Sequence, residues 1–151
     1  MNGFLTAGEL VSFIKDATTQ LRAAGYNGVV STADTVGTYL SYPSICNALE
    51  GPVHVNIHPY FDNGCSPSGA GSFVVDQKSL VEDACGHKTV IVSETGWPSG
   101  GDGGDRANSD DQATAILSIN DATNGDVTFF SYSNDQWKAS GIEQHFGIST
   151  R

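Results

Sequence analysis

The most informative segment of this 151-residue chain reads Thr89-Val90-Ile91-Val92-Ser93. Three consecutive apolar residues occupy its centre, so a strand here would carry hydrophobic side chains on both faces. Strands that are covered on both faces belong to parallel sheets with helices on either side. The segment therefore predicts an inner strand of a parallel α/β sheet.

The flanking sequence alternates between helical and extended patterns. Further strands are expected at 29–32, 53–58 and 127–132, and helices at 6–25, 69–85 and from 109 through 119, with a helical pattern over 36–49 that breaks at Pro43. Capping boxes open two of the helices, at Thr6-Ala7-Gly8-Glu9 and Ser109-Asp110-Asp111-Gln112. Residues 99–110, rich in glycine and aspartate, read as a long loop. Helices and strands that alternate in this way predict four parallel strands with right-handed crossovers.

Four such units make about half of a (β/α)8 barrel, which usually needs about 250 residues. Four strands cannot close a barrel alone, and the two outer strands would be open edges that favour pairing with another chain. The pattern leaves three alternatives: part of a barrel, a stand-alone open sheet, and a homo-oligomer that forms through these edges.

Charge and hydrophobic patterning exclude other classes. The chain has 7 Lys and Arg against 17 Asp and Glu, a formal net charge of −10, so we expect no nucleic-acid partner. No apolar run approaches the roughly 20 residues of a membrane span, so no membrane partner is expected. Met1-Asn2-Gly3-Phe4 lacks the basic and apolar parts of a signal peptide.

The cysteine and histidine patterns predict no metal or redox motif. Cys46, Cys65 and Cys85 include no C-x-x-C pair, and an odd number leaves at least one unpaired in a monomer. His54 and His58 lack an identifiable third ligand, so we expect no metal site. The pairing of the cysteines stays open at this point.

Polar and aromatic side chains gather where the predicted strands end. Reactive groups of parallel α/β folds lie at the carboxyl ends of the strands. Those positions hold Asp34, Thr35, His58, Tyr60, Phe61, Glu94, Trp97, Asn134, Asp135, Trp137 and Lys138. Because carboxylates can act as acid, base or nucleophile on a glycoside, this set predicts a sugar site.

Glu94 is the strongest catalytic candidate because it lies at the end of an apolar strand, two residues before Gly96. The alternatives are an ion-paired surface carboxylate for Glu94 and a core position for Trp97. Their combination with Gly96 and Pro98 at one strand end favours a functional site.

The segment Val90-Ile91-Val92-Ser93-Glu94-Thr95-Gly96-Trp97-Pro98-Ser99 resembles the signature of glycoside hydrolase family 17, the β-1,3-glucanases, and most closely their fungal cell-wall members. Segments 10–14, 21–26, 55–61 and 131–138 are similar to the same family, so the resemblance runs from about 5 to 148. It implies half of a TIM barrel, strands five to eight, with Glu94 as the nucleophile on the seventh strand. It also implies β-1,3-glucan as substrate, no cofactor, and a secreted or cell-wall location.

The resemblance implies further site residues. The residues that would contact substrate are Asp34, Asn56, His58, Tyr60 and Trp97. Asp135 and Lys138 would support the active site, and the alternative for these two is a solvated pair.

One catalytic element of the family is missing from this sequence. Family members are retaining enzymes with two carboxyl groups about 5–5.5 Å apart, and the proton donor lies in a Gly-Asn-Glu motif on the fourth strand. No such motif occurs here, and the capping position of Glu9 excludes it as a substitute. We therefore expect residues 1–151 to form a partial domain, truncated on its N-terminal side, with weak or no activity alone. The alternatives are a non-catalytic β-glucan-binding or decoy half-barrel and a fragment without independent function.

Overall fold

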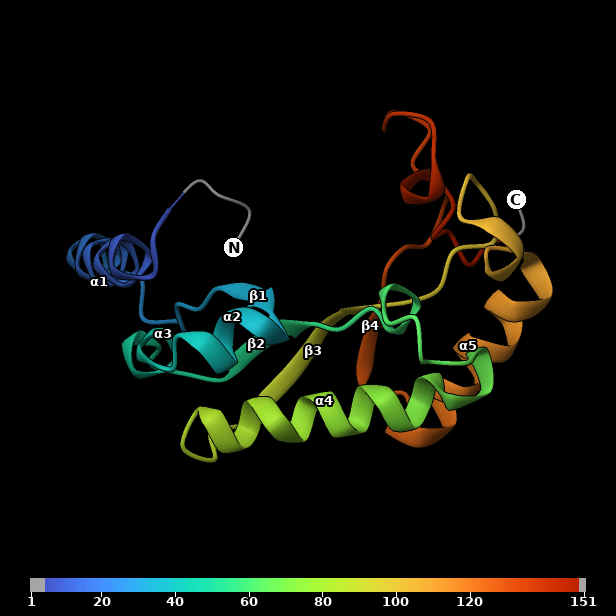
Figure 1. Cartoon of the computed structure of the whole chain (residues 1–151). Helices are drawn as coiled ribbons and strands as arrows, with labels where there is room; N and C mark the ends of the chain where they lie inside the picture. The colour runs from blue at the N-terminus through green and yellow to red at the C-terminus, as the bar shows by residue number, and fades with distance from the viewer. Residues whose placement is uncertain (1–4, 150–151) are drawn as a thin grey trace. The chain divides into compact units, whose positions relative to one another are not determined.

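A computed structural model describes residues 5–149, which form an α/β fold around one sheet (Figure 1). The sheet has the strand order β1-β2-β3-β4. Its strands are β1 (Ala33–Thr35), β2 (Val53–Asn56), β3 (Val90–Thr95) and β4 (Val127–Phe129). The helices are α1 (Ala7–Ala23), α2 (Val36–Ser41), α3 (Ser44–Ala48), α4 (Ala70–Ala84) and α5 (Ser109–Thr123). The prediction about Met1-Asn2-Gly3-Phe4 falls outside the described residues.

Most predicted elements are confirmed, including the capping box of α1. Glu9 donates its backbone N–H to the Thr6 hydroxyl at 3.3 Å, and the Glu9 carboxylate accepts the Thr6 N–H at 2.7 Å. The second box is wrong by one residue, because Asn108 is the N-cap of α5 and accepts the N–H of Asp111 at 2.9 Å. The helical pattern that breaks at Pro43 is confirmed as two short helices, α2 and α3.

The first predicted strand is wrong in position. Residues 29–32 are not a strand, and β1 begins at Ala33, which pairs with His54 of β2. The position of the first strand is thus determined by its pairing with β2 and not by the β-branched composition of residues 29–32. Asp34 consequently lies within β1 and not after it.

The expectation that the apolar centre of β3 is buried on both faces is wrong, because successive residues of a strand point to opposite faces and only one of those faces is buried here. Val90 and Val92 are buried, whereas the Ile91 side chain between them is 38% exposed.

The chain divides into two compact units. The first comprises residues up to Asn56 with Lys78–Ile91, and the second comprises Ile57–Gln77 with residues from Val92 onward. In the first unit, β1 and β2 run parallel over a core that includes Tyr39, Ile45, Val53, Val55 and Val81. No helix among residues 5–149 is long and apolar enough to cross a membrane.

A disulfide links Cys46 of α3 to Cys85, next to the end of α4, and Cys65 is the free cysteine. Lys88 reinforces the same region, because its Nζ donates to the carbonyls of Cys46 at 2.8 Å and Leu49 at 2.6 Å. The pairing that the sequence left open is thereby assigned within the first unit.

Removing this disulfide should destabilise the first unit. The bond closes a loop with a sequence separation of 39, which corresponds to about 4 kcal/mol in the chain-entropy model. We expect Cys46→Ala to lower the urea midpoint strongly, and dithiothreitol to lower the midpoint of the unchanged chain. Cys65→Ala is the matched control and should leave the midpoint nearly unchanged. Equal midpoints for Cys46→Ala and Cys65→Ala would contradict the assignment.

In the second unit, β4 pairs in parallel with β3, and α5 packs against the turn before α4. Gly71 permits this approach, since a Cβ there would collide with the backbone carbonyl of Ser118. The Ser118 hydroxyl accepts the Gly71 N–H at 3.0 Å and donates to the Ser68 carbonyl at 2.8 Å. This packing fixes the framework that carries the candidate site.

Candidate active site

Glu94 lies at the carboxyl end of β3 on a backbone that is hydrogen-bonded on both sides. Ile57 donates its N–H to the Glu94 carbonyl at 2.8 Å, and Phe130 donates its N–H to the Thr95 carbonyl at 2.8 Å. The Glu94 side chain is 39% exposed. The carboxylate is therefore accessible while its backbone is fixed.

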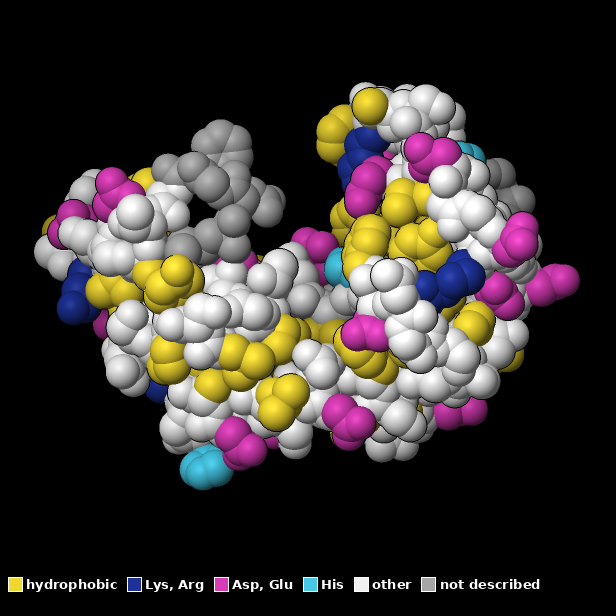
Figure 2. All heavy atoms as spheres, in the orientation of Figure 1, with side chains coloured by type: hydrophobic (Ala, Val, Ile, Leu, Met, Phe, Trp, Pro, Cys, Tyr) yellow, Lys and Arg dark blue, Asp and Glu magenta, His cyan; other side chains and the backbone are white. Residues whose placement is uncertain are grey.

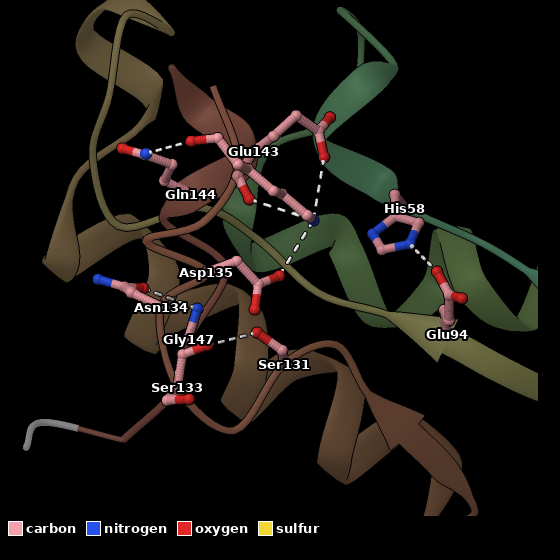
Figure 3. Close-up of polar contacts among 10 residues, drawn as sticks. His58, Glu94, Ser131, Ser133, Asn134, Asp135, Glu143, Gln144 and Gly147 are labelled. Atoms are coloured by element: carbon pink, nitrogen blue, oxygen red, sulfur yellow. Dashed lines mark hydrogen bonds and ion pairs between the residues drawn. The ribbon is translucent and has the colours of Figure 1, made fainter. Parts of the chain in front are cut away.

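His58 contacts the Glu94 carboxylate (Figure 3). Its Nε2 lies 3.4 Å from Glu94 Oε2, and its side chain is only 16% exposed. Burial lowers the pKa of His58, although the hydrogen bond and charge of Glu94 act in the opposite direction. His58 is consequently neutral at neutral pH.

Three phenylalanine rings surround the His58 imidazole. The ring centroids of Phe146, Phe130 and Phe61 lie 5.5, 5.9 and 6.1 Å from that of His58, all in edge-to-face geometry. Such pairs are favourable beyond the area that they bury. They restrict the rotation of the imidazole beside Glu94.

The residues after Glu94 pack inward. A Cβ at Gly96 would lie 2.5 Å from the Phe130 carbonyl oxygen, so only glycine fits at this position. Trp97 has no exposed surface, and its indole N–H donates to the Arg106 carbonyl at 2.8 Å. The Arg106 guanidinium lies 5.0 Å from the centroid of the Trp97 ring.

Tyr60 is buried beside Trp97, with ring centroids 5.3 Å apart, and its hydroxyl donates to the Gly103 carbonyl at 2.9 Å. Neither ring presents a face to solvent in this chain. Trp97 therefore packs in the core of the second unit, and contact of Trp97 or Tyr60 with substrate stays a prediction.

Lys138 and Asp135 form an ion pair, with Nζ 3.0 Å from Asp135 Oδ2. Lys138 Nζ also lies 3.9 Å from Glu143 Oε2 and 4.5 Å from the centroid of the Phe130 ring. Both members of the pair are mostly buried, so the solvated-pair alternative does not apply. They join the chain after β4 to the turn at Ile142–Gln144 and pack it against the ring that borders His58.

Asp34 and Asn56 belong to the first unit. The Asp34 carboxylate accepts hydrogen bonds from the Thr38 hydroxyl at 2.8 Å and the Thr35 N–H at 2.7 Å, which hold the first turn of α2. Their contact with substrate stays a prediction.

Sequence reasoning missed several members of the site. Phe130 was seen only as part of a strand, and Phe146 and Glu143 follow a loop without any periodic pattern. The contact between His58 and Glu94 did have a signal, because their two strands were expected to end at the same edge of the sheet. Within residues 5–149, no three His, Cys, Asp or Glu side chains are grouped as metal ligands would be.

The structure thus presents a glutamate at the carboxyl end of an inner strand of a parallel α/β sheet, which is where barrel enzymes carry their reactive groups. A family model described as the BtgE/BtgC glycoside hydrolase domain matches residues 1–147, and the chain belongs to this family. The resemblance to glycoside hydrolase family 17 is thereby confirmed.

Curated relatives agree with this assignment. The "Probable beta-glucosidase btgE" of Aspergillus terreus is 40% identical over 97% of this chain and 27% of its own length. The "Probable family 17 glucosidase SCW10" of Saccharomyces cerevisiae is 35% identical over 97% of this chain and 39% of its own length. The chain thus spans between a quarter and two fifths of these two relatives.

Solved structures show the same fold. The glycoside hydrolase family 17 β-1,3-glucanosyltransferase of Rhizomucor miehei matches with a TM-score of 0.79 at 24% identity, covering 97% of this chain and 54% of that chain. A plant β-glucan endohydrolase matches with a TM-score of 0.72 at 21% identity, covering 98% of this chain and 65% of that one. Four parallel strands with flanking helices, corresponding to about half of such a structure, are therefore confirmed.

Proposed function

We propose that this chain carries the nucleophile half of a retaining glycoside hydrolase site for β-1,3-glucan, with Glu94 as the nucleophile. The observation that carries the proposal is the accessible Glu94 carboxylate, on a backbone bonded on both sides and in contact with a buried imidazole. A mutant of the Rhizomucor miehei relative is described in complex with laminaritriose, which supports a β-1,3-glucan as the substrate class.

In the proposed reaction, Glu94 attacks the anomeric carbon while the bond to the leaving oxygen breaks. That oxygen needs a proton, and water then cleaves the glycosyl–Glu94 ester. The sequence contains no Gly-Asn-Glu motif. We therefore propose that the 151 residues alone cleave unactivated glucan poorly, since general acid catalysis is worth about 10²–10⁴-fold.

Covalent capture tests the nucleophile directly. A 2-deoxy-2-fluoro-β-laminaribioside with a 2,4-dinitrophenolate leaving group needs no acid, and its fluorine slows hydrolysis of the ester. We expect an intact-mass gain of one fluorinated disaccharide unit on the folded chain, located at Glu94 by peptide mapping. Glu94→Gln should gain no mass, whereas the exposed surface variant Asp83→Asn should label like the parent. Labelling of Glu94→Gln would refute the proposal.

A non-catalytic β-glucan-binding function is the second candidate. Hydrophobic side chains lie at the surface of both units (Figure 2), and the large exposed aromatic ones of the second unit are Phe61, Tyr132 and Trp137. Aromatic rings of this kind can stack on sugars without any chemistry. Saturable laminarin binding that survives Glu94→Gln, with no covalent capture by the parent, would favour this function. Absence of near-UV circular dichroism would instead indicate a chain without a fixed fold.

We propose a secreted or cell-wall location, which the Cys46–Cys85 disulfide supports because such bonds persist in oxidising compartments. Self-association through the edges β1 and β4 is also a proposal, and light scattering of the purified chain would measure it.

A further inference from the structure

We propose that His58 is a positioning residue for Glu94, and that its neutral imidazole, protonated on Nε2, holds the carboxylate in the orientation for attack. This inference rests on the proposed function of Glu94. It replaces the expectation that His58 contacts substrate.

The geometry places the donor where the carboxylate needs it. His58 directly precedes the turn Pro59–Phe61, and its Nε2 points at Glu94 Oε2 from 3.4 Å (Figure 3). Contacts of this kind are often long in ligand-free sites and shorten when substrate binds. Since Nε2 is engaged and the side chain is only 16% exposed, little of His58 is left for a sugar.

The surroundings of the ring select one protonation state. His58 Nδ1 is buried without a hydrogen-bond partner. A proton on Nδ1 would be an unpaired buried donor and would turn the Nε2 lone pair toward the carboxylate, which is repulsive. The imidazolium would pair with Glu94 but would bury both a charge and an unpaired Nδ1–H. Only the neutral form with hydrogen on Nε2 pairs its N–H and buries no charge.

The charged groups that face His58 come from three elements. Glu94 lies on β3, Glu143 on the turn Ile142–Gln144, and Lys138 on the segment after β4. Burial, the largest effect, lowers the pKa of His58; the two carboxylates raise it and Lys138 lowers it, with a net decrease. The neutral form therefore persists below the usual histidine pKa of 6.5.

A neutral donor suits a nucleophile. It orients the Glu94 carboxylate through a hydrogen bond alone. An imidazolium would attract the carboxylate more strongly and would thereby make it a weaker nucleophile toward the anomeric carbon. Acidification below the pKa of His58 creates that cation, so the glycosylation rate should fall on the acid side of its pH profile.

Nitrogen-15 NMR of the imidazoles tests the inference without any activity. We expect His58 to show a protonated Nε2 and an unprotonated Nδ1 at pH 7, and to titrate below the usual histidine pKa of 6.5. Because Glu94 raises the pKa of His58, Glu94→Gln should lower the titration midpoint further. A proton on Nδ1, a midpoint at or above the usual histidine pKa of 6.5, or a midpoint unchanged by Glu94→Gln would overturn the inference.

Two substitutions then test positioning against a merely structural role. His58→Phe keeps a ring but loses the donor, whereas the side-chain amide of His58→Gln can place a donor near the Nε2 position. We expect about a 10²-fold lower rate of covalent capture for His58→Phe, as for an active group misplaced by about 1 Å. His58→Gln should recover part of this rate. Both variants should lose the decrease in glycosylation rate that protonation of His58 causes at acid pH. Capture by His58→Phe at the parent rate would overturn the inference while leaving Glu94 as the nucleophile. Failure of the parent to label at all would instead refute the proposed function.

Discussion

Purified chain mixed with 2,4-dinitrophenyl β-laminaribioside should release a burst of dinitrophenolate equal to one equivalent of protein. The leaving group departs as an anion, so the first step needs only the Glu94 nucleophile. Hydrolysis of the resulting ester needs a base to activate water. Without that base the ester accumulates, and the release of dinitrophenolate shows a burst. Laminarin, whose leaving group is a sugar oxygen, should react more slowly by at least the 10²–10⁴-fold that a general acid contributes.

Azide sharpens this experiment because it is an anionic nucleophile that needs no base. It should accelerate the steady state after the burst and yield a β-glycosyl azide, since two inversions at the anomeric carbon retain its configuration. Glu94→Gln should lose both the burst and the azide effect, whereas Asp83→Asn should keep both. Laminarin cleavage as fast as that of the aryl glycoside would mean that the chain contains its own proton donor. A folded chain without a burst would remove Glu94 as the nucleophile.

Local sequence patterns predicted most helices and strands of the fold. The remaining boundaries depend on contacts such as strand pairing. The helices and three strands follow from periodicity and caps, which are properties of adjacent residues. Residues 29–32 look like a strand by composition, yet β1 begins at Ala33 because the register with β2 begins there. The N-cap of α5 is Asn108 and not the predicted Ser109, because the Asn108 side chain accepts the Asp111 N–H.

The candidate site divides in the same way. Glu94 was found from its own neighbours in sequence, and Gly96 is explained by the close approach of the Phe130 carbonyl. The rings of Phe61, Phe130 and Phe146 reach His58 from three separate segments, and no local pattern encodes that meeting. The same holds for the Cys46–Cys85 pair, which spans 39 residues.

Trp97→Ala should destabilise the second unit by about 3–5 kcal/mol, the usual cost of deleting a large buried aromatic side chain. The indole has no exposed surface, packs against Tyr60, and donates to the Arg106 carbonyl. Its removal would leave a cavity next to a part-buried carbonyl that has lost its donor. Urea unfolding followed by far-UV circular dichroism measures the loss without relying on tryptophan fluorescence.

Trp137→Ala is the matched control, because the only other tryptophan of the sequence is 81% exposed. Its truncation should change stability by no more than about 0.5 kcal/mol. Trp97→Phe should fall between the two, since it restores most of the ring but not the N–H that pairs with Arg106. Similar midpoints for Trp97→Ala and Trp137→Ala would contradict the buried position. A large difference between them would mean that Trp97 belongs to the buried framework of the second unit.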